Sequence, residues 1–437
     1  MANETFDVAV GMRRDVMDRA IEKLYKQLYP KYFKGDADAG SGRQVFYDVK
    51  SAPTLDFVAT SGTAAAVREE LAKIPKPAGA PANEALLLQA PPLSLQAFGA
   101  ALDAKSVKVR FEKIDVAIKT SKGEAKTSAA AIVTVGFEIE YPERQPARVK
   151  FVVRDAKATT PNPDDQYILN AVVIPAMKKL AAQVMSAIQL PPMISVAGIQ
   201  FDLPEPRIIG DYFVILAKLL SRHFPLGLDA PIPGGNPEAF LVLSPQMMQI
   251  AFDTATRGLT HVEQASGSHD LVVSTAYYEA KVVVSDIKGV AAGAEFPLSA
   301  KVEGSAKGWI TTFLGDPTAY FGARPIPSPV VGRVALGVEG NKINARISSV
   351  NTFSIDIYPT GGAISDVIDF VLSPLKGFAT LFMPRLVNYL KGVKFDVLTV
   401  PDLPLTYDGI GVTIRPKDLR LASSGQHLNL TGSVTLL

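Results

Sequence analysis

Ser268, His269 and Asp270 stand consecutively and are the residue types of a nucleophile, a general base and an orienting acid. A triad needs its three side chains to converge, whereas adjacent residues of a strand or loop point away from one another. The chain also contains no G-x-S-x-G sequence, which would mark a nucleophile elbow. We therefore interpret Ser268–Asp270 as a polar turn before a strand that begins at Leu271.

The glycine-rich run from Gly35 to Gly42 can be compared with two kinds of ligand-binding loop, and it fits neither. A phosphate-binding loop requires a lysine that this run lacks. Asp36 and Asp38 open like a calcium loop, but Tyr47 occupies the twelfth position, where a glutamate is required. The run is interpreted as an exposed turn.

The histidines and cysteines give little material for a metal site or for catalysis. The four histidines, at positions 223, 261, 269 and 427, are never three or four residues apart. The chain has no cysteine, which excludes thiolate nucleophiles and cysteine-ligated zinc. We expect a non-enzymatic protein with no catalytic residue, no metal and no cofactor.

Charge and hydropathy narrow the class of partner. The 437 residues include 45 Lys and Arg against 43 Asp and Glu, so the net charge is +2 and no global field attracts nucleic acid. Apolar residues make up 47% and charged residues 20%, which is too apolar for disorder. The start of the chain has no signal-peptide pattern. We expect a cytoplasmic protein, with secretion by a route other than Sec left open.

The first part of the chain reads as a strand, a helix and a β meander. Apolar residues alternate from Phe6 to Val10, and from Met12 to Tyr29 they recur at helical spacing, ending at Pro30. Further along, the alternation changes phase at Glu112 and Lys113, which predicts a β-bulge that bends the strand.

A second helical pattern covers Asp164 to Leu190, with a kink predicted at Pro175. The segment 224–238 has four prolines and three glycines and no periodicity, which is typical of a linker. We expect domains at 1–223 and 239–437, joined by this linker.

The second half repeats the order of the first. A strand at Phe240–Leu243 is followed by Ser244 and Pro245, an N-cap and first-turn pair that begins a helix. A β meander then runs to about Tyr358, and an apolar helix is predicted from Ile364 to Tyr389. Near the ends of the halves, Gly198 and Gly409 lie in similar sequences 211 residues apart.

The predicted fold class is α+β. A strongly curved antiparallel sheet has one apolar concave face and a helix has one apolar stripe, so wrapping the sheet around the helix buries both. The sequence predicts two such rolls in tandem, each around a long apolar helix. The interior of a roll is either filled by side chains or left open as a channel, and both alternatives stay open here.

The element order of each half, the proline linker and the closing segment from Gly409-Ile410 to Thr431 resemble the tubular lipid-binding (TULIP) superfamily, which includes bactericidal/permeability-increasing protein. With no signal peptide and the opening Phe6-Asp7-Val8, the chain looks more like the bacterial TULIP proteins encoded beside clostridial neurotoxins. Its lack of cysteine departs from the secreted animal members, which usually carry a disulfide.

The resemblance implies a lipid-binding or lipid-transfer protein that holds a phospholipid or other acyl chain in elongated apolar channels. Partner expectations are lipid, peripheral contact with a membrane and proteins from neighbouring genes, with no nucleic acid. Candidate lining residues share the apolar faces of the predicted helices: Val16, Ala20, Leu24, Leu28, Met177, Leu180, Ala181, Val184, Met185, Ile188, Met248, Phe252, Val367, Ile368, Val371, Leu375, Phe378, Phe382 and Leu386.

Three further expectations concern the alternatives. A protein-interaction or toxin-accessory scaffold with the same fold and no lipid transfer is the second function class. Lys23, Lys26, Lys31 and Lys34 are placed to touch anionic head groups, although acidic neighbours favour a solvated helix face. Trp309 stands in an apolar strand, where core packing is favoured over a membrane anchor.

Overall fold

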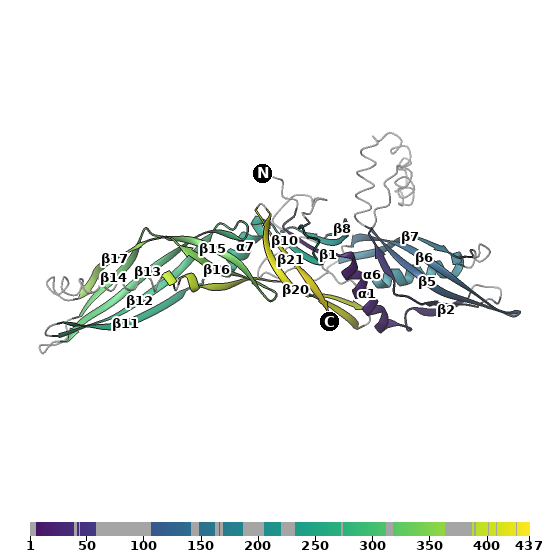
Figure 1. Ribbon diagram of the computed structural model, residues 1–437, viewed down its shortest axis with the longest axis horizontal. Helices are drawn as coiled ribbons and strands as arrows, with labels where there is room; N and C mark the ends of the chain where they lie inside the picture. The colour runs from purple at the N-terminus through teal and green to yellow at the C-terminus, as the bar shows by residue number, and fades with distance from the viewer. Residues whose placement is uncertain are drawn as a thin grey trace, which may run out of the picture. The chain divides into compact units, whose positions relative to one another are not determined.

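The computed structural model (Figure 1) divides into two compact units. The first comprises Met1–Val242, Pro401–Arg420 and Leu430–Leu437, and the second Leu243–Val400 and Leu421–Asn429. The predicted boundaries differ from this division in the last part of the chain, where strands after Pro401 belong mostly to the first unit. The structure describes residues 6–38, 42, 44–57, 106–140, 148–161, 166, 169–186, 205–219, 232–271, 274–311, 318–362, 387–388, 390–400, 402–407, 409–424 and 426–437.

The first unit begins with strand β1 (Val8–Arg13) and helix α1 (Arg14–Leu28). The apolar face of α1 is buried as its period predicts, with Val16, Ala20 and Leu24 no more than 3% exposed. The helix ends at Leu28, and its C-cap Tyr29 stands immediately before Pro30. Strand and helix therefore both agree with the sequence pattern.

A curved antiparallel sheet faces α1. Its order is β2-β3-β5-β6-β7, and β4 also pairs with β5. These strands are β2 (Lys34–Asp38), β3 (Gln44–Val49), β4 (Thr54–Asp56), β5 (Ser106–Thr120), β6 (Gly123–Glu140) and β7 (Arg148–Thr159). The predicted exposed turn at Gly35–Gly42 is wrong for Gly35 to Asp38, because these residues pair with β3.

The predicted bulge is confirmed. The register between β5 and β6 shifts between Phe111 and Ile114, so that both of these side chains are buried and the intervening Glu112 and Lys113 are both exposed. An extra residue of this kind bends a strand, and here it lets β5 keep an apolar face toward the interior on both sides of the bend.

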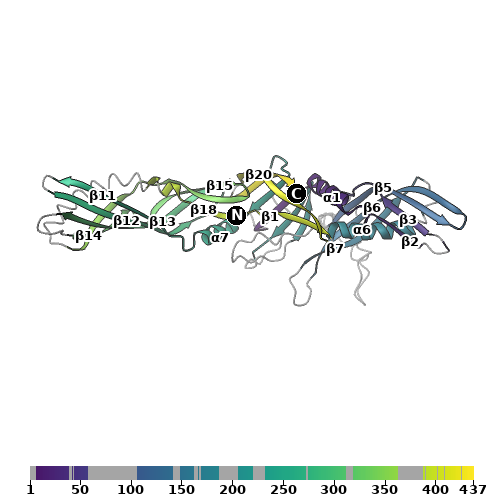
Figure 2. The same ribbon diagram turned by 90° about the horizontal axis from the view of Figure 1, so that it is seen from below.

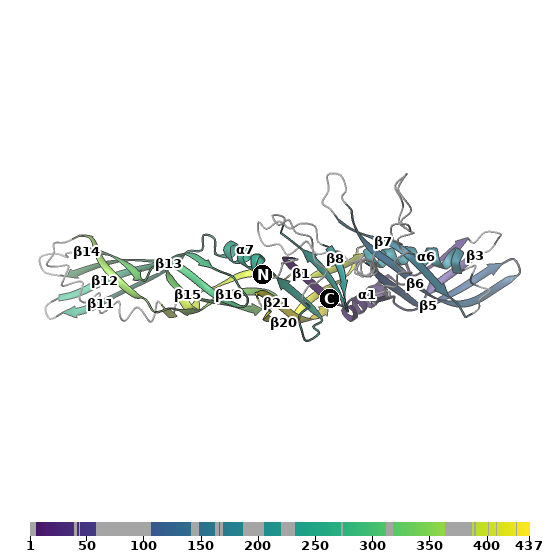
Figure 3. The same ribbon diagram turned by 90° about the horizontal axis from the view of Figure 1, so that it is seen from above.

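A helical segment packs on β6 and β7 from the interior side (Figures 2 and 3). It consists of a π-helical turn, η2 (Leu169–Val173), and α6 (Ile174–Ser186). Pro175 lies at the second position of α6, directly after the wider turn. Because proline donates no backbone hydrogen bond, the departure from regular α-helix before it has a physical cause. Residues 164–165, 167–168 and 187–190 of the predicted helix lie outside the described residues.

A second sheet of the first unit has the order β19-β20-β21-β10-β1-β9-β8. The strands not yet given are β8 (Glu205–Ile209), β9 (Tyr212–Ala217), β10 (Ala239–Leu243), β19 (Leu403–Tyr407), β20 (Ile410–Ser424) and β21 (His427–Leu436). The opening strands of the two predicted halves are thus neighbours at the centre. The internal repeat stays a prediction, since Gly198 and its surroundings lie outside the described residues.

The second unit begins with α7 (Pro245–Thr256), whose N-cap Ser244 accepts a hydrogen bond from Met247 N at 3.1 Å, as predicted. Its sheet has the order β11-β12-β13-β15-β16-β18, and β14 joins β13 to β17. The strands are β11 (His261–Leu271), β12 (Ser274–Gly289), β13 (Glu295–Thr311), β14 (Thr318–Ile326), β15 (Val330–Glu339), β16 (Lys342–Val350), β17 (Ser354–Gly362) and β18 (Lys394–Thr399).

Two predictions for this unit have different outcomes. Ser268–Asp270 is not a turn, because all three residues pair with residues of β12 and belong to strand β11. The predicted apolar helix Ile364–Tyr389 lies almost wholly outside the described residues. The described part of the chain is therefore mostly curved antiparallel sheet with short helices, in keeping with an α+β roll.

Candidate functional site

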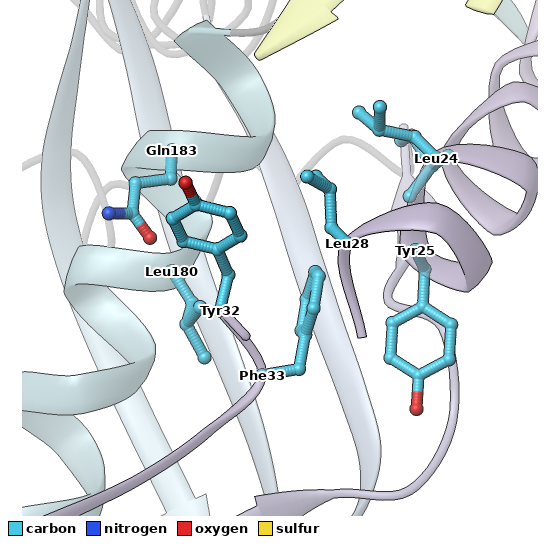
Figure 4. Close-up of a pocket in the computed structure, with 8 residues that line it drawn as sticks. Leu24, Tyr25, Leu28, Tyr32, Phe33, Leu180 and Gln183 are labelled. Carbon is cyan, nitrogen blue, oxygen red and sulfur yellow. The ribbon is translucent and has the colours of Figure 1, made fainter. Parts of the chain in front are cut away.

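A cleft between α1 and α6 is the candidate site of the first unit (Figure 4). Figure 4 shows Tyr32 and Phe33 lying between side chains of the two helices. The complete lining is apolar or aromatic except for one amide: Ile21, Leu24, Tyr25, Leu28, Tyr32, Phe33, Leu180 and Gln183. Tyr25 and Tyr32 are half-buried, so the cleft reaches the protein surface.

The cleft is nearly filled by these side chains. Its cavity volume is about 10 Å³, which is room for about one water molecule. Phe33 is only 2% exposed and Leu180 3%, and both pack in the core behind the cleft. An acyl chain therefore enters only if some of these side chains move.

An aromatic cluster forms one wall of the cleft. The centroid of the Tyr25 ring lies 4.7 Å from that of Phe33, in an edge-on arrangement, and 5.5 Å from that of Tyr29. Tyr25 Oη donates a hydrogen bond to the Val49 carbonyl oxygen at 2.8 Å. Burial is the main cause that raises the pKa of Tyr25. The hydroxyl thus stays protonated and fixes the ring against β3.

Asp48 lies next to this wall and has two lysines close to its carboxylate. Its carboxylate accepts hydrogen bonds from Tyr29 Oη and Lys50 Nζ, and Lys34 Nζ lies 3.7 Å away. Partial burial would raise the pKa of Asp48, but these hydrogen bonds and the two lysines outweigh burial, and the pKa is lowered. The surroundings of the cleft are therefore ionic, whereas its lining is apolar.

The lysines that the sequence singled out mostly have acidic or carbonyl partners. Lys26 pairs with Glu22 one turn earlier, and Lys23 donates to the Leu436 carbonyl oxygen at 3.1 Å. Lys34 shares Asp48 with Lys50. The Lys26–Glu22 pair lies on a solvated helix face, as the sequence favoured, whereas Lys34 stands at the start of β2.

A similar cleft lies between α7 and the sheet of the second unit. Its lining includes the predicted residues Met248 and Phe252, together with Phe296, whose ring lies 5.1 Å from that of Phe252. Its volume is also about 10 Å³. In the described part of this unit, the space beside the helix is likewise occupied by side chains.

The predicted lining residues have different outcomes. Val16, Ala20, Met177, Ala181 and Met185 are fully buried in the core of the first unit. Leu24, Leu28 and Leu180 meet at the α1–α6 cleft, and Met248 and Phe252 meet at the second cleft. Outside the described residues or side chains lie Val184, Ile188, Val367, Ile368, Val371, Leu375, Phe378, Phe382 and Leu386. Contact of any of these residues with lipid stays a prediction.

Sequence reasoning missed the aromatic wall and the amide. Tyr25, Tyr32, Phe33 and Gln183 line the cleft but fall outside the apolar stripes of the two helices. One sequence signal for this wall is the recurrence of aromatic residues around the end of the first helix, at Tyr25, Tyr29, Tyr32 and Phe33. Large amphipathic rings at such a spacing mark a surface that is apolar on one side and wet on the other.

Two further features are absent from the described residues. No group of three or more acidic or histidine side chains is suited to a metal ion among them. None of the helices in the same part of the chain has the length and hydropathy of a membrane span.

Comparison with known proteins gives matches only among solved structures. No family model and no curated protein matches this chain. P47 of Clostridium botulinum E1 is 10% identical over 99% of each chain, with a TM-score of 0.42. A lipopolysaccharide binding protein is 11% identical over 99% of each chain, with a TM-score of 0.33. P47 from Clostridium botulinum A2 is 8% identical over 98% of this chain and 97% of that one, with a TM-score of 0.39.

The sequence identities are 11% or lower and the TM-scores are below 0.5. Sites and ligands of the matched proteins are therefore not carried over to this chain.

Proposed function

We propose that the protein binds a lipid by inserting an acyl chain between α1 and α6. The supporting observation is the composition of this cleft: seven of its eight lining residues are aliphatic or aromatic, and the cleft reaches the surface beside Tyr25 and Tyr32. Such a lining offers no catalytic group and favours a hydrocarbon ligand. The TULIP resemblance points to the same class of ligand.

Binding requires the cleft to widen, because its volume is that of about one water. Each buried methylene contributes about 0.8 kcal/mol, so an acyl chain of moderate length offsets the loss of a few side-chain contacts. Met177 and Met185 of α6 are fully buried in the same core as Leu24, Leu28 and Leu180 of the cleft. Methionine adapts to a changed shape at low cost, which suits a core that rearranges around a ligand.

The first test is extraction of the purified protein with organic solvent, followed by mass spectrometry and by a fluorescent-phospholipid exchange assay. Leu180→Trp fills the cleft and should weaken exchange at least about tenfold. Lys179→Trp adds the same ring to the exposed face of α6 and is the matched control. Melting temperatures of both variants separate loss of the site from loss of the fold.

Two results would contradict the proposal. One is a wild-type protein with neither extractable nor exchangeable lipid. The other is a folded Leu180→Trp variant that exchanges lipid as fast as wild type. For lipid transfer itself, the further measurement is movement of the labelled lipid from donor to acceptor vesicles at catalytic amounts of protein.

A second candidate function is a scaffold for protein partners that needs no lipid. The observation in its favour is that side chains fill both described clefts and leave a cavity of only about 10 Å³ in each. In that case, delipidated protein should form a complex of defined mass with a purified product of a neighbouring gene. Light scattering after size exclusion would measure it, and a complex that forms only with lipid present would speak against this candidate.

A further inference from the structure

In the sheet of the second unit, strands β11, β12, β13 and β14 have one apolar face and one polar face. Val282, Val284 and Val302 are buried on the apolar face. On the opposite face, side chains of β11, β12, β13 and β14 stand in cross-strand rows. One row is Gln264, Lys281, Ser305 and Gly322. The next is Ser266, Glu279, Lys307 and Tyr320, and the third is Ser268, Tyr277, Trp309 and Thr318.

An open depression of about 530 Å³ lies over the first two rows. Its size lies in the range of small-molecule sites, and it is many times larger than either apolar cleft. The lining residues are Gln264, Ser266, Glu279, Ala280, Lys281, Ser305, Ala306, Lys307 and Tyr320.

The depression presents both donors and acceptors. Gln264 supplies an amide, Ser266 and Ser305 hydroxyls, Glu279 a carboxylate, and Lys281 and Lys307 ammonium groups. Glu279 and Lys307 are direct cross-strand neighbours, and Lys307 Nζ lies 5.0 Å from the centroid of the Trp309 ring. The formal charges of two lysines and one glutamate leave only +1, so the site is polar without a strong charge.

Aromatic rings border the depression. Tyr320 is 50% exposed, and Tyr277 is 37% exposed and stacked on Trp309 at 5.5 Å. The Tyr358 ring lies against Gly322, where an added Cβ would be 2.5 Å from its Cζ atom. Trp309 is therefore part of a half-exposed aromatic pair and not of the core, which corrects the expectation from the sequence.

This combination suits a sugar better than a lipid surface or a simple anion. A saccharide has many hydroxyls that donate and accept, and C–H faces that pack on aromatic rings. A membrane surface favours protruding apolar side chains and a basic excess, whereas this depression is recessed and contains a carboxylate. A simple anion is disfavoured by the Glu279 carboxylate, which lines the same depression as the two lysines.

We propose that the polar face of β11–β14 binds a short saccharide in this depression, with Glu279, Lys281 and Lys307 as hydrogen-bonding partners and Tyr320 as an aromatic wall. The saccharide site belongs to the second unit and is separate from the α1–α6 cleft. It goes beyond the proposed function and does not depend on it.

The experiment uses the full-length chain on an array of immobilised oligosaccharides, neutral and acidic, followed by calorimetric titration of the tightest binder in free form. Wild type is expected to bind one set of related glycans, with affinity that changes little between 0.05 and 0.5 M NaCl because the net local charge is small. Ser305→Trp, which fills the depression, should weaken binding at least about tenfold, as should Glu279→Gln.

Two controls lie outside the depression. Glu303→Gln changes a carboxylate two residues before Ser305, and Lys288→Trp adds the same ring elsewhere on β12. Both should bind like wild type. If Ser305→Trp misfolds, Glu279→Gln carries the test, because it changes no volume.

Several results would overturn the proposal. These are the absence of wild-type binding across the array, binding that survives both variants, and binding confined to sulfated or phosphorylated glycans that disappears in 0.5 M NaCl. Binding to phosphatidylcholine vesicles that is lost in Ser305→Trp, without glycan binding, would instead identify the face as a membrane contact and would also overturn it.

Discussion

Gly11 lies in β1 where the ring of Phe240 crosses it. A Cβ at position 11 would be 2.2 Å from Phe240 Cε1 and Cζ, which is far too close for non-bonded carbon atoms. Phe240 is 3% exposed, and its ring lies 5.3 Å from that of Tyr212, so the ring has little room to move. The absence of a side chain at Gly11 therefore lets the two opening strands approach each other.

Gly11→Ala should lower the free energy of unfolding by about 1–3 kcal/mol, because a buried ring must shift to admit one methyl group. Urea denaturation monitored by circular dichroism measures this change. Phe240→Leu removes the clash, so the double variant should recover part of the loss. An unchanged midpoint in Gly11→Ala would mean that the ring has space elsewhere.

Asp18 and Asp15 of α1 have pKa values shifted in opposite directions. Burial raises the pKa of Asp18, although its carboxylate accepts a hydrogen bond from Leu55 N at 2.6 Å. A hydrogen bond from Arg13 lowers the pKa of Asp15, and the guanidinium contacts both carboxylate oxygens. The Asp18 carboxyl thus stabilises the folded state when it is protonated, whereas the Asp15 carboxyl does so when it is ionised.

Asp18→Asn should raise stability at pH 7 by up to about 0.5 kcal/mol, because Asn still accepts from Leu55 N and carries no charge. The stability tied to the Asp18 carboxyl is present at low pH and is lost as the pH rises through its raised folded pKa. The advantage of Asn should therefore disappear when the pH falls below that pKa.

Asp15→Asn is the matched comparison and should have the opposite sign at pH 7, lowering stability by up to about 1 kcal/mol. The contribution of Asp15 is present above its unfolded pKa and is lost as the pH falls through the lowered folded pKa. Urea midpoints of both variants between pH 3 and pH 7 measure the difference. Parallel pH profiles for the two variants would contradict the assignment.

At the scale of elements, the sequence was most informative where the physical cause is local. The stripe of α1, the Ser244 cap and the bulge at Glu112 and Lys113 each depend on residues within a few positions of one another. Ser268–Asp270 was misread because its pairing partners in β12 decide its conformation. The aromatic border at Tyr277 and Trp309 depends on the same cross-strand register, which no single-strand pattern contains.

The cap of α7 gives a test at this scale. Ser244 is fully buried, and its hydroxyl oxygen accepts from Met247 N, so Ser244→Ala leaves a backbone donor without this acceptor. The second unit should lose about 1 kcal/mol of stability. Hydrogen exchange of the α7 amides, with Ser244→Thr as the variant that keeps a cap, measures the loss. Equal protection in both variants would show that the cap is dispensable.

At the scale of the whole molecule, distant segments make up the first unit. Glu238 stands just before β10 and contacts two other elements: Arg19 Nη2 of α1 lies 2.6 Å from its Oε1 atom, and Val434 N of β21 donates to its Oε2 atom at 2.9 Å. The end of the predicted linker is therefore bound to the first unit. The proline and glycine content that predicts a linker carries no signal for these long-range contacts.

Glu238→Ala should destabilise the first unit by about 1–3 kcal/mol, because it removes an ion pair and leaves the Val434 N–H without its acceptor. Glu22→Ala is the control, since its exposed pair with Lys26 lies within one helix and should change stability by less than about 0.5 kcal/mol. Differential scanning calorimetry compares the two. Equal melting temperatures would show that the Glu238 contacts contribute little.

The place of β20 and β21 in the same sheet as β1 has a consequence for biosynthesis. Lys23 and Leu436, joined by a hydrogen bond, are 413 residues apart in sequence. At the usual rates of translation, this separation corresponds to about 20 to 80 s between the emergence of α1 and that of its partner. During that interval the apolar edge of β10 has no β21 beside it, while most of the second unit is being synthesised. We expect a chaperone to protect this edge until the closing strands arrive.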